Sequence, residues 1–317
     1  MEQRRNNKQF KEHNNRQKAN KLAEYITGDN LRKYCRDKIN EYVKGAISVF
    51  DGAVGSGQLE QYLDARHIYG VDVQNESLEA LAENYDNVTT YHMSFFEFDE
   101  DIEADVTLMN PPFSLEYKSL SEKEKINIAM DFPWKKSGKL DDIFILKGLK
   151  YSKKYGFFII FPGVAYRKTE LRFRREVGNN LVEINEIRNA FEDTNISVLF
   201  LVIDKEKEID DVKSSIFDCK LNKLIYEESI KINPDKWDYA REPVEKEVVD
   251  IDLVERELNE IDIKNLENKL ETRLFLYETF GKDSGTENFI NALIEIAETF
   301  KRRYENARKA KTQSTAD

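Results

Sequence analysis

The sequence contains few of the side chains on which metal centres and disulfide frameworks depend. Its 317 residues include only two cysteines, Cys35 and Cys219, and three histidines. The two cysteines are far apart, which excludes a disulfide framework and favours a reducing compartment. The histidines, His13, His67 and His92, have no ligand-like spacing, so we predict no metal site.

Long hydrophobic runs are also missing. The longest ones, near 157–161 and 198–203, have the length of strands and are too short to span a bilayer. The first twenty residues have no apolar core of the kind that a secretory signal carries. We therefore expect a cytoplasmic protein.

Basic residues are outnumbered by acidic ones, and the formal net charge is −11. A protein that binds nucleic acid usually carries a basic surface, so this charge argues against such a role for the chain as a whole. The charge is unevenly spread, however. Basic residues gather in an N-terminal arm, 1–21, which we expect to be flexible, and again in 153–175. The acidic excess lies mainly in 242–271 and 97–105.

Short apolar segments alternate with amphipathic ones between residues 30 and 203. This alternation predicts βαβ units and a mainly parallel sheet. No clear strand is expected in 114–140, a long loop of the kind that often faces a substrate, and 206–243 is expected to be irregular. Helical spacing occurs at 30–43, 59–63, 76–85 and 141–152, and strands are expected at 46–50, 68–73, 88–93, 106–109, 156–161, 182–187 and 198–203.

The pattern changes beyond residue 243, where apolar residues recur at intervals of three to five. This predicts two long helices joined by a turn at Gly281 and Gly285. We expect a catalytic α/β domain over 22–243 and a helical hairpin over 244–317. The apolar stripe of the hairpin either packs on the rest of the chain or docks on a partner.

A glycine-rich stretch, 51–57, follows the first expected strand. Its glycines permit a tight turn and close approach of a ligand, and the helix after it would offer free N–H groups. Glu60 stands where a dinucleotide-binding site needs its third glycine. The spacing suits a cofactor without phosphates whose amino-acid part has a carboxylate to place. The alternative is an ordinary strand-to-helix turn.

Asp72 ends the second expected strand, about twenty residues after the glycine-rich stretch. A carboxylate at this place can accept both ribose hydroxyls of a nucleoside cofactor. The alternative is an aspartate that caps the next helix.

The most specific motif is the sequence Asn110-Pro111-Pro112-Phe113. Two consecutive prolines at the end of a strand fix the loop so that one carbonyl points outward. The Asn110 side chain adds a second acceptor, and two acceptors match the two N–H bonds of an amino group on a planar base. Phe113 offers a flat face for stacking, and a base in a duplex must be flipped out to reach it. The alternative is a purely structural loop.

In this order, the motifs resemble those of N6-adenine DNA methyltransferases, specifically the modification subunits of type I restriction-modification systems and their stand-alone relatives. The resemblance covers roughly residues 22–205. Its further elements are Glu24-Tyr25-Ile26-Thr27, Asp142-Ile143-Phe144, Ile160-Phe161-Pro162 and the stretch from Phe191 to Ile196. It implies a Rossmann-like class I methyltransferase fold, with a mostly parallel seven-stranded sheet and a C-terminal helical extension.

The resemblance also implies the chemistry. S-adenosylmethionine would be the cofactor, and N6 of a flipped-out adenine in double-stranded DNA would accept the methyl group. A specificity subunit or a second copy would bind the C-terminal helices. The implied catalytic residues are Asn110, Pro111, Pro112 and Phe113, and the implied cofactor-binding residues are Thr27, Asp51, Ala53, Gly55, Gly57, Asp72, Val73, Ser94, Phe95 and Asn110.

Five basic residues are predicted to contact DNA phosphates if they lie beside the catalytic loop, and to form a solvated helix face otherwise. They are Arg167, Lys168, Arg172, Arg174 and Arg175.

The sequence departs from the family pattern at three positions. Gly52 and Gly28 stand where the family usually has prolines, and Ser94 stands where an aspartate usually meets the adenine amino group of the cofactor. Similar loops serve RNA base methyltransferases and enzymes that methylate protein glutamine, often with tyrosine as the aromatic residue, whereas this chain has Phe113. An inactive cofactor-binding scaffold is a further alternative.

Overall fold

The structure is a computed structural model that describes residues 10–12, 27–113, 115–191, 196–243, 251–283 and 285–314. The chain divides into two units after Pro243, and each is described by itself. Some stretches singled out in the sequence lie outside the described residues. They are the N-terminal arm apart from 10–12, residues 24–26, and residues 192–195.

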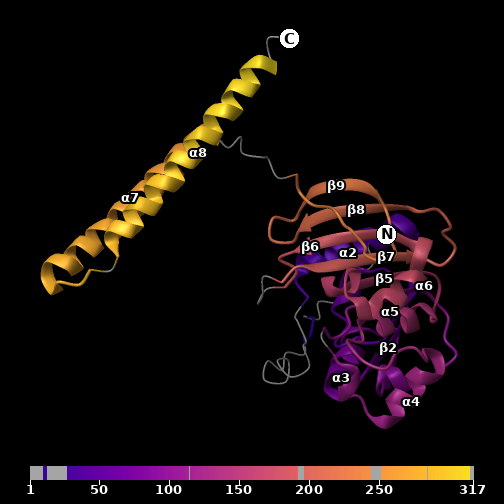
Figure 1. Cartoon of the computed structure of the whole chain (residues 1–317). Coiled ribbons are helices and arrows are strands. Elements are labelled where there is room, and N and C mark those ends of the chain that lie inside the picture. Colours follow the sequence, from indigo (N-terminus) through magenta and orange to yellow (C-terminus); the bar gives the residue numbers. More distant parts are fainter. Residues whose placement is uncertain are drawn as a thin grey trace. The chain divides into compact units, whose positions relative to one another are not determined.

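The first unit is built on one large sheet (Figure 1). Its strands are β1 (Ile47–Asp51), β2 (Ala65–Asp72), β3 (Val88–His92), β4 (Ala104–Met109), β5 (Ser152–Ile160), β6 (Leu181–Arg188), β7 (Val198–Asp204), β8 (Asp211–Asp218) and β9 (Lys223–Lys231). The order is β3-β2-β1-β4-β5-β7-β6-β8-β9. Neighbours among β1 to β5 are parallel, and β7 runs antiparallel to both β5 and β6.

All seven expected strands are present, but the prediction of a seven-stranded sheet is wrong, because the sheet has nine. The two additional strands, β8 and β9, come from the segment 206–243 that we expected to be irregular. β8 pairs parallel with β6, and β9 pairs antiparallel with β8. β9 is an edge strand rich in lysine and glutamate, and such strands carry little of the apolar alternation that predicts a strand.

Helices cover both faces of the sheet. They are α2 (Asp29–Tyr42), α3 (Asn75–Asn84), α4 (Glu122–Asp131), α5 (Asp141–Leu149) and α6 (Leu171–Val177). Successive side chains of a strand point to opposite faces, so β1 contributes to two cores. Val49 belongs to the cluster that includes Leu31 of α2, whereas Phe50 belongs to the cluster that includes Ile143 of α5.

The helix expected directly after the glycine-rich stretch is only a 3-10 turn, η1 (Leu59–Tyr62). So short a turn has few aligned peptide dipoles and cannot act as the N-terminus of a long helix does. Ligand binding at this place therefore depends on the loop and on the side chains around it.

Apart from Thr27, the predicted catalytic and cofactor-binding residues lie at or after the carboxyl ends of parallel strands, which meet at one edge of the sheet. The glycine-rich stretch follows β1, Asp72 ends β2, Ser94 comes after β3, and Asn110 comes directly after β4. α4 lies in the segment 114–140 and contacts the short turn η2 (Phe95–Glu97), where the Asn127 amide donates to the Phe96 carbonyl over 3.1 Å.

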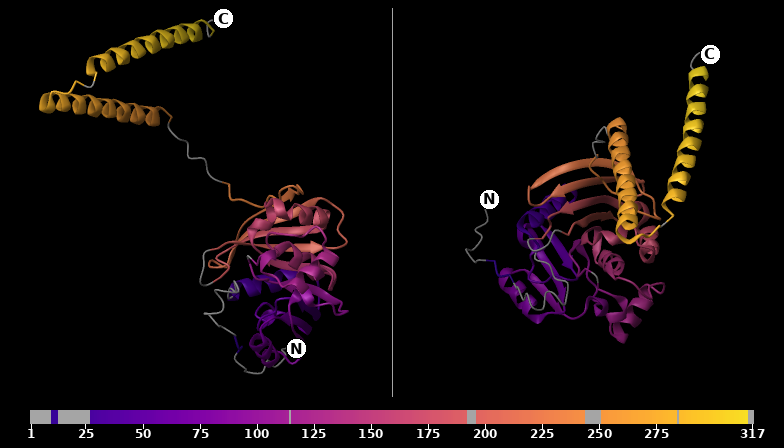
Figure 2. Two further views of the ribbon diagram at one scale, coloured as in Figure 1. Left: turned by 60° about the horizontal axis from the view of Figure 1, so that its bottom comes forward. Right: turned by 60° about the vertical axis from the view of Figure 1, so that its left-hand side comes forward.

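The second unit consists of two long helices, α7 (Ile251–Phe280) and α8 (Thr286–Ser314) (Figure 2). Near their connection, the guanidinium of Arg273 lies 4.4 Å from the centre of the Phe289 ring. Many of their apolar side chains are exposed: Leu253, Leu258, Ile261, Ile263, Leu274, Phe275, Ile290, Ile294, Ile296 and Phe300. In the described part of the chain, no helix is both long and apolar enough to cross a bilayer.

Candidate active site

The glycine-rich stretch turns sharply at two positions. Gly55 and Gly57 have φ angles of 54° and 79°, in the left-handed region that favours glycine. A Cβ atom at Gly57 would lie 2.5 Å from the Tyr85 ring and 2.6 Å from Leu81. The stretch therefore packs closely over α3, while nothing lies within 4 Å of the place that a Cβ at Gly55 would take.

Asp72 is held in place by the backbone of two segments. Its carboxylate accepts the Gly55 N–H over 2.9 Å and the Gln74 N–H over 2.8 Å, one on each oxygen. Burial raises the pKa of Asp72. Each carboxylate oxygen has a further lone pair, so the arrangement leaves acceptors for the two hydroxyls of a ribose.

Asp51 and Glu60 form a buried pair of carboxyl groups beneath the glycine-rich stretch. Asp51 accepts the Ala53 N–H over 2.7 Å. Glu60 is 0% exposed, and in the described part of the chain no lysine, arginine or other side chain except that of Asp51 pairs with its carboxyl oxygens. The two carboxyl groups lie within hydrogen-bonding reach of each other. Burial raises the pKa of Glu60 to about 8, and burial together with Glu60 raises the pKa of Asp51.

Gly52, where the family usually has proline, is explained by its neighbours. A Cβ atom at this position would lie 2.7 Å from the Phe95 ring and 2.9 Å from the end of the Met109 side chain. Phe95 in turn stacks on Phe144, with ring centres 5.5 Å apart. The space that a proline would need is therefore filled by an aromatic ring in this chain.

Val73 follows β2 and Ser94 comes after β3, so both lie at the carboxyl edge of the sheet. The Ser94 hydroxyl donates to the carboxylate of Glu124 in α4. Val73 follows Asp72 and is 57% exposed, so its apolar side chain is accessible beside the Asp72 carboxylate. Glu124 has no counterpart among the predicted residues, since the sequence of the long loop gave no sign that it reaches this edge.

Asn110 has a fixed orientation and one free acceptor. Its amide nitrogen donates to the Thr27 hydroxyl over 3.3 Å. Thr27 is itself held by a backbone bridge to Phe191, and its carbonyl accepts the Arg32 side chain over 2.7 Å. The amide oxygen of Asn110 is buried, and no donor in the described part of the chain reaches it. The structure thus brings Thr27 and Asn110 together across 83 residues.

Phe113 does not offer a free ring face. It is 4% exposed and belongs to the cluster beneath α2, where its ring centre lies 5.8 Å from that of Phe191. Pro111 is buried and Pro112 is half-buried. A base can stack on Phe113 only if the loop moves, and the predicted stacking role stays a prediction.

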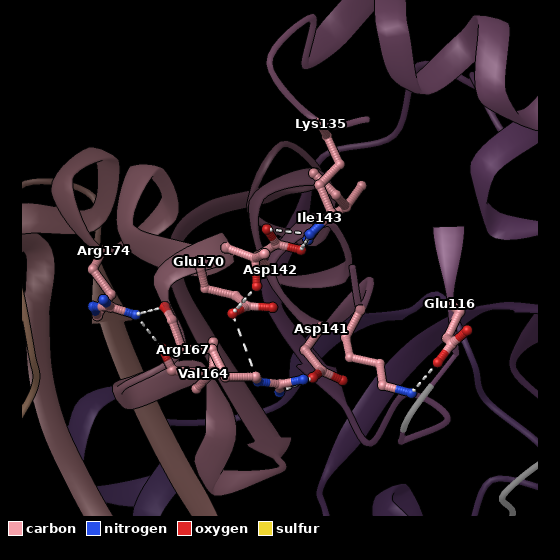
Figure 3. Close-up of polar contacts among 11 residues, drawn as sticks. Glu116, Lys135, Asp141, Asp142, Ile143, Val164, Arg167, Glu170 and Arg174 are labelled. Carbon is pink, nitrogen blue, oxygen red and sulfur yellow. Dashed lines mark hydrogen bonds and ion pairs between the residues drawn. The ribbon is translucent and has the colours of Figure 1, made fainter. Parts of the chain in front are cut away.

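Buried ion pairs join the segments that follow β4 and β5 (Figure 3). The Lys135 ammonium lies 2.7 Å from both carboxylate oxygens of Asp142, which also accepts the Ile143 N–H. Arg167 contacts Asp141 over 2.6 Å. Burial raises the pKa of Asp142 to about 6, although Lys135 opposes this. Lys135 was missed because nothing in its local sequence distinguishes it from a surface lysine.

One of the predicted phosphate contacts is wrong. Arg174 is 1% exposed, and its guanidinium donates to backbone carbonyls, including those of Val164 and Asp235 over 2.9 and 2.6 Å. It therefore supports the fold and has no donor face toward solvent. Arg172 and Arg175 are exposed and pair with Glu176 and Asp235, and Arg167 pairs with Asp141. Lys168 is exposed. For these four residues, DNA contact stays a prediction.

Comparison with solved structures shows the class of fold. A type I restriction-modification methyltransferase subunit from Streptococcus thermophilus matches with a TM-score of 0.52 and 20% identity, over 64% of this chain and 50% of that one. A putative class I S-adenosylmethionine-dependent methyltransferase from Listeria monocytogenes matches with a TM-score of 0.50 and 18% identity, over 61% and 65%. A chain from a type I restriction-modification system matches with a TM-score of 0.54 and 12% identity, over 84% and 69%.

The strand order and the site at the carboxyl edge define a class I methyltransferase fold. The chain belongs to the N-6 DNA methylase family, whose model matches residues 8–236. This confirms the family expected from the motifs. The chain spans about half the length of the Streptococcus subunit, and a search of curated proteins finds no match to it.

Proposed function

We propose that the chain transfers a methyl group from S-adenosylmethionine to N6 of adenine in DNA. The observation that carries the proposal is the buried, unpaired amide oxygen of Asn110 directly after β4. A buried acceptor without a donor costs about 1–3 kcal/mol, so this open acceptor at the carboxyl edge of the sheet supports a ligand that supplies the donor. An exocyclic amino group is such a donor.

The residues at the edge of the sheet fit the proposed cofactor. Asp72 keeps free acceptors for the ribose hydroxyls, and the exposed apolar side chain of Val73 suits the face of an adenine ring. The buried carboxyl of Asp51, at the end of β1, suits an ammonium group. When bound, S-adenosylmethionine supplies the methyl group on a positively charged sulfur.

Asn110 contributes to the reaction by position. Thr27 holds its amide nitrogen, and this fixes the amide oxygen as the acceptor of one N–H bond of the target amino group. The Pro111 carbonyl would accept the second N–H. Two such bonds favour a pyramidal nitrogen with its lone pair available for in-line attack. The contribution of the protein is then orientation and electrostatic preorganisation.

DNA is proposed as the substrate on the basis of family membership, together with the Phe113 variant of the loop. The formal net charge of the chain is −11, so we propose that a separate specificity subunit supplies part of the surface that meets DNA. The exposed apolar side chains of α7 and α8 would bind it. The match to a chain from a type I restriction-modification system supports this proposal. The match covers 84% of this chain, which is more than the first unit contains, so it includes part of the second unit.

The experiment that tests the proposal measures 6-methyladenine in DNA from cells that express the chain, by digestion and mass spectrometry. Wild type is compared with Asn110→Ala and with Asn180→Ala. Asn180 is a matched control, because its amide bonds to the Lys207 carbonyl before β6, at the opposite edge of the sheet. We expect 6-methyladenine with wild type and Asn180→Ala, and none with Asn110→Ala.

The experiment is repeated with the neighbouring open reading frame co-expressed. Methylation that needs this second product supports the specificity subunit as the occupant of α7 and α8, and loss of methylation on deletion of 251–314 would establish the contact. If the chain methylates DNA alone and forms a complex of two copies, the partner of α7 and α8 is a second copy and not a specificity subunit. If DNA carries no 6-methyladenine in either setting, the proposed substrate is wrong.

A further inference from the structure

The buried carboxyl of Glu60 has no role in the function proposed so far. It is 0% exposed, and in the described part of the chain no positively charged group lies against it. A buried carboxylate without a positively charged partner is costly. If this position served packing alone, an apolar side chain would fill it at a lower cost. The position therefore calls for an explanation that involves charge.

The carboxyl of Asp51 is the partner that lies within reach of Glu60. Two carboxyls at hydrogen-bonding distance cannot both ionise easily, and they hold one proton between them. In the described part of the chain, neither is paired with a lysine or an arginine. The other titratable groups that face the pair are Asp72 at the end of β2 and the thiol of Cys35 on α2, and neither supplies a positive charge.

The order of strands indicates which part of the cofactor meets this pair. β1 lies between β2 and β4. Asp72 ends β2 and suits the ribose, while Asn110 follows β4 and marks the place of methyl transfer. The amino-acid part of the cofactor is attached to the sulfur, so it falls near the end of β1, where Asp51 lies. Its ammonium group is the positive charge that the pair lacks.

We propose that Glu60 is a positioning residue for the cofactor, which shares one proton with Asp51 and releases it when the α-ammonium group of the cofactor binds Asp51. Atoms and charge balance, because the ammonium replaces the proton as the positive partner and the proton leaves to buffer. The inference rests on the proposed function, and it adds Glu60 to the cofactor site and couples cofactor binding to pH.

The direct test is calorimetric titration of the full chain with S-adenosylhomocysteine at pH 7, in two buffers with different heats of ionisation. The difference in observed heat gives the number of protons released. We expect about one proton per bound ligand for wild type. Between about pH 6 and 7.5, where the α-amino group is mostly charged, affinity should fall up to about tenfold for each pH unit of acidification.

Two controls separate proton exchange from a structural role. 5′-Methylthioadenosine lacks the amino-acid part and should bind wild type without proton release, a comparison that needs no variant. Glu60→Gln keeps a hydrogen bond to Asp51 but has no proton to lose, so S-adenosylhomocysteine should bind it with no proton release and with a flat pH profile. Glu183→Gln changes another buried carboxyl, on β6, and should release the same number of protons on ligand binding as wild type.

The outcomes distinguish the two proposals. If wild type binds S-adenosylhomocysteine without releasing a proton, or if Glu60→Gln releases as much as wild type, the inference is overturned and the proposed function stands. If neither adenosyl ligand binds to wild type, the proposed cofactor is wrong and the inference is overturned with it.

Discussion

The clearest quantitative prediction concerns Gly52. Replacing it by alanine adds a methyl group 2.7 Å from the Phe95 ring and 2.9 Å from Met109. Phe95 cannot turn away freely, because its ring stacks on that of Phe144. Overpacking of this kind costs about 1–3 kcal/mol. We therefore expect Gly52→Ala to lower the free energy of unfolding by that amount, and Gly52→Pro, which restores the residue usual in the family, to lower it further.

The measurement is urea unfolding followed by tryptophan fluorescence. Phe95→Leu is combined with Gly52→Ala in a double-mutant cycle, and the smaller side chain should recover part of the loss, with a coupling energy of about 1 kcal/mol. Gly55→Ala is the matched control. Its Cβ would meet nothing within 4 Å, but its φ of 54° costs about 1–2 kcal/mol in a non-glycine residue, and Phe95→Leu should not relieve this.

The reasoning is refuted if Gly52→Ala unfolds within 0.5 kcal/mol of wild type. It is refuted equally if Phe95→Leu rescues the two glycine variants to the same extent, because steric contact with the ring would then not be the cause.

The pKa of Glu60 is raised to about 8, so the folded chain keeps a proton that the unfolded chain loses near pH 4.5. The stabilisation from this proton is therefore lost as the pH rises from about 4.5 toward 8. The free energy of unfolding in urea should fall with pH across this range for wild type, and Glu60→Gln should remove this dependence. Asp142→Asn leaves the buried Lys135 ammonium without its counter-charge and should destabilise the fold by about 3–5 kcal/mol in the same assay; a change below 1 kcal/mol would contradict this. Arg174→Ala should lower the melting temperature, because the buried carbonyls of Val164 and Asp235 lose their donor. Arg172→Ala, on the same helix, should leave the melting temperature unchanged. Equal effects of the two variants would contradict the assigned difference between a buried and an exposed arginine.

Much of the fold could be predicted from local pattern. The strand β1 is a short, fully buried and mostly apolar run that ends at Asp51. The second half of β5 and most of β7 are also fully buried, so these stretches are apolar almost throughout. Edge strands behave differently, because only one face needs apolar side chains and charges protect the open edge. β9 has the sequence KLIYEESIK, which is why it was missed and why the sheet was expected to be too small.

The candidate site shows the same division. Asn110, Asp72 and the glycines could be found because each occupies a motif with fixed spacing after a strand. Glu60 was noticed only as a residue unsuited to a dinucleotide site, and its lack of a positively charged partner among the described residues appeared with the structure. Arg174 was misassigned, because a basic run gives no indication of which arginine turns inward to meet backbone carbonyls.

The sequence by itself determined the class of fold and the places of the candidate motifs along it, because strand-and-turn motifs are local and their spacing is readable. Only the tertiary structure decided which distant groups meet. It placed Thr27 against Asn110, Phe95 over Gly52, and Glu60 beside Asp51. These contacts arise because parallel strands bring residues that are distant in the sequence to one edge of the sheet. Burial then decides which hydrogen-bond partners each residue has and how far its pKa is shifted.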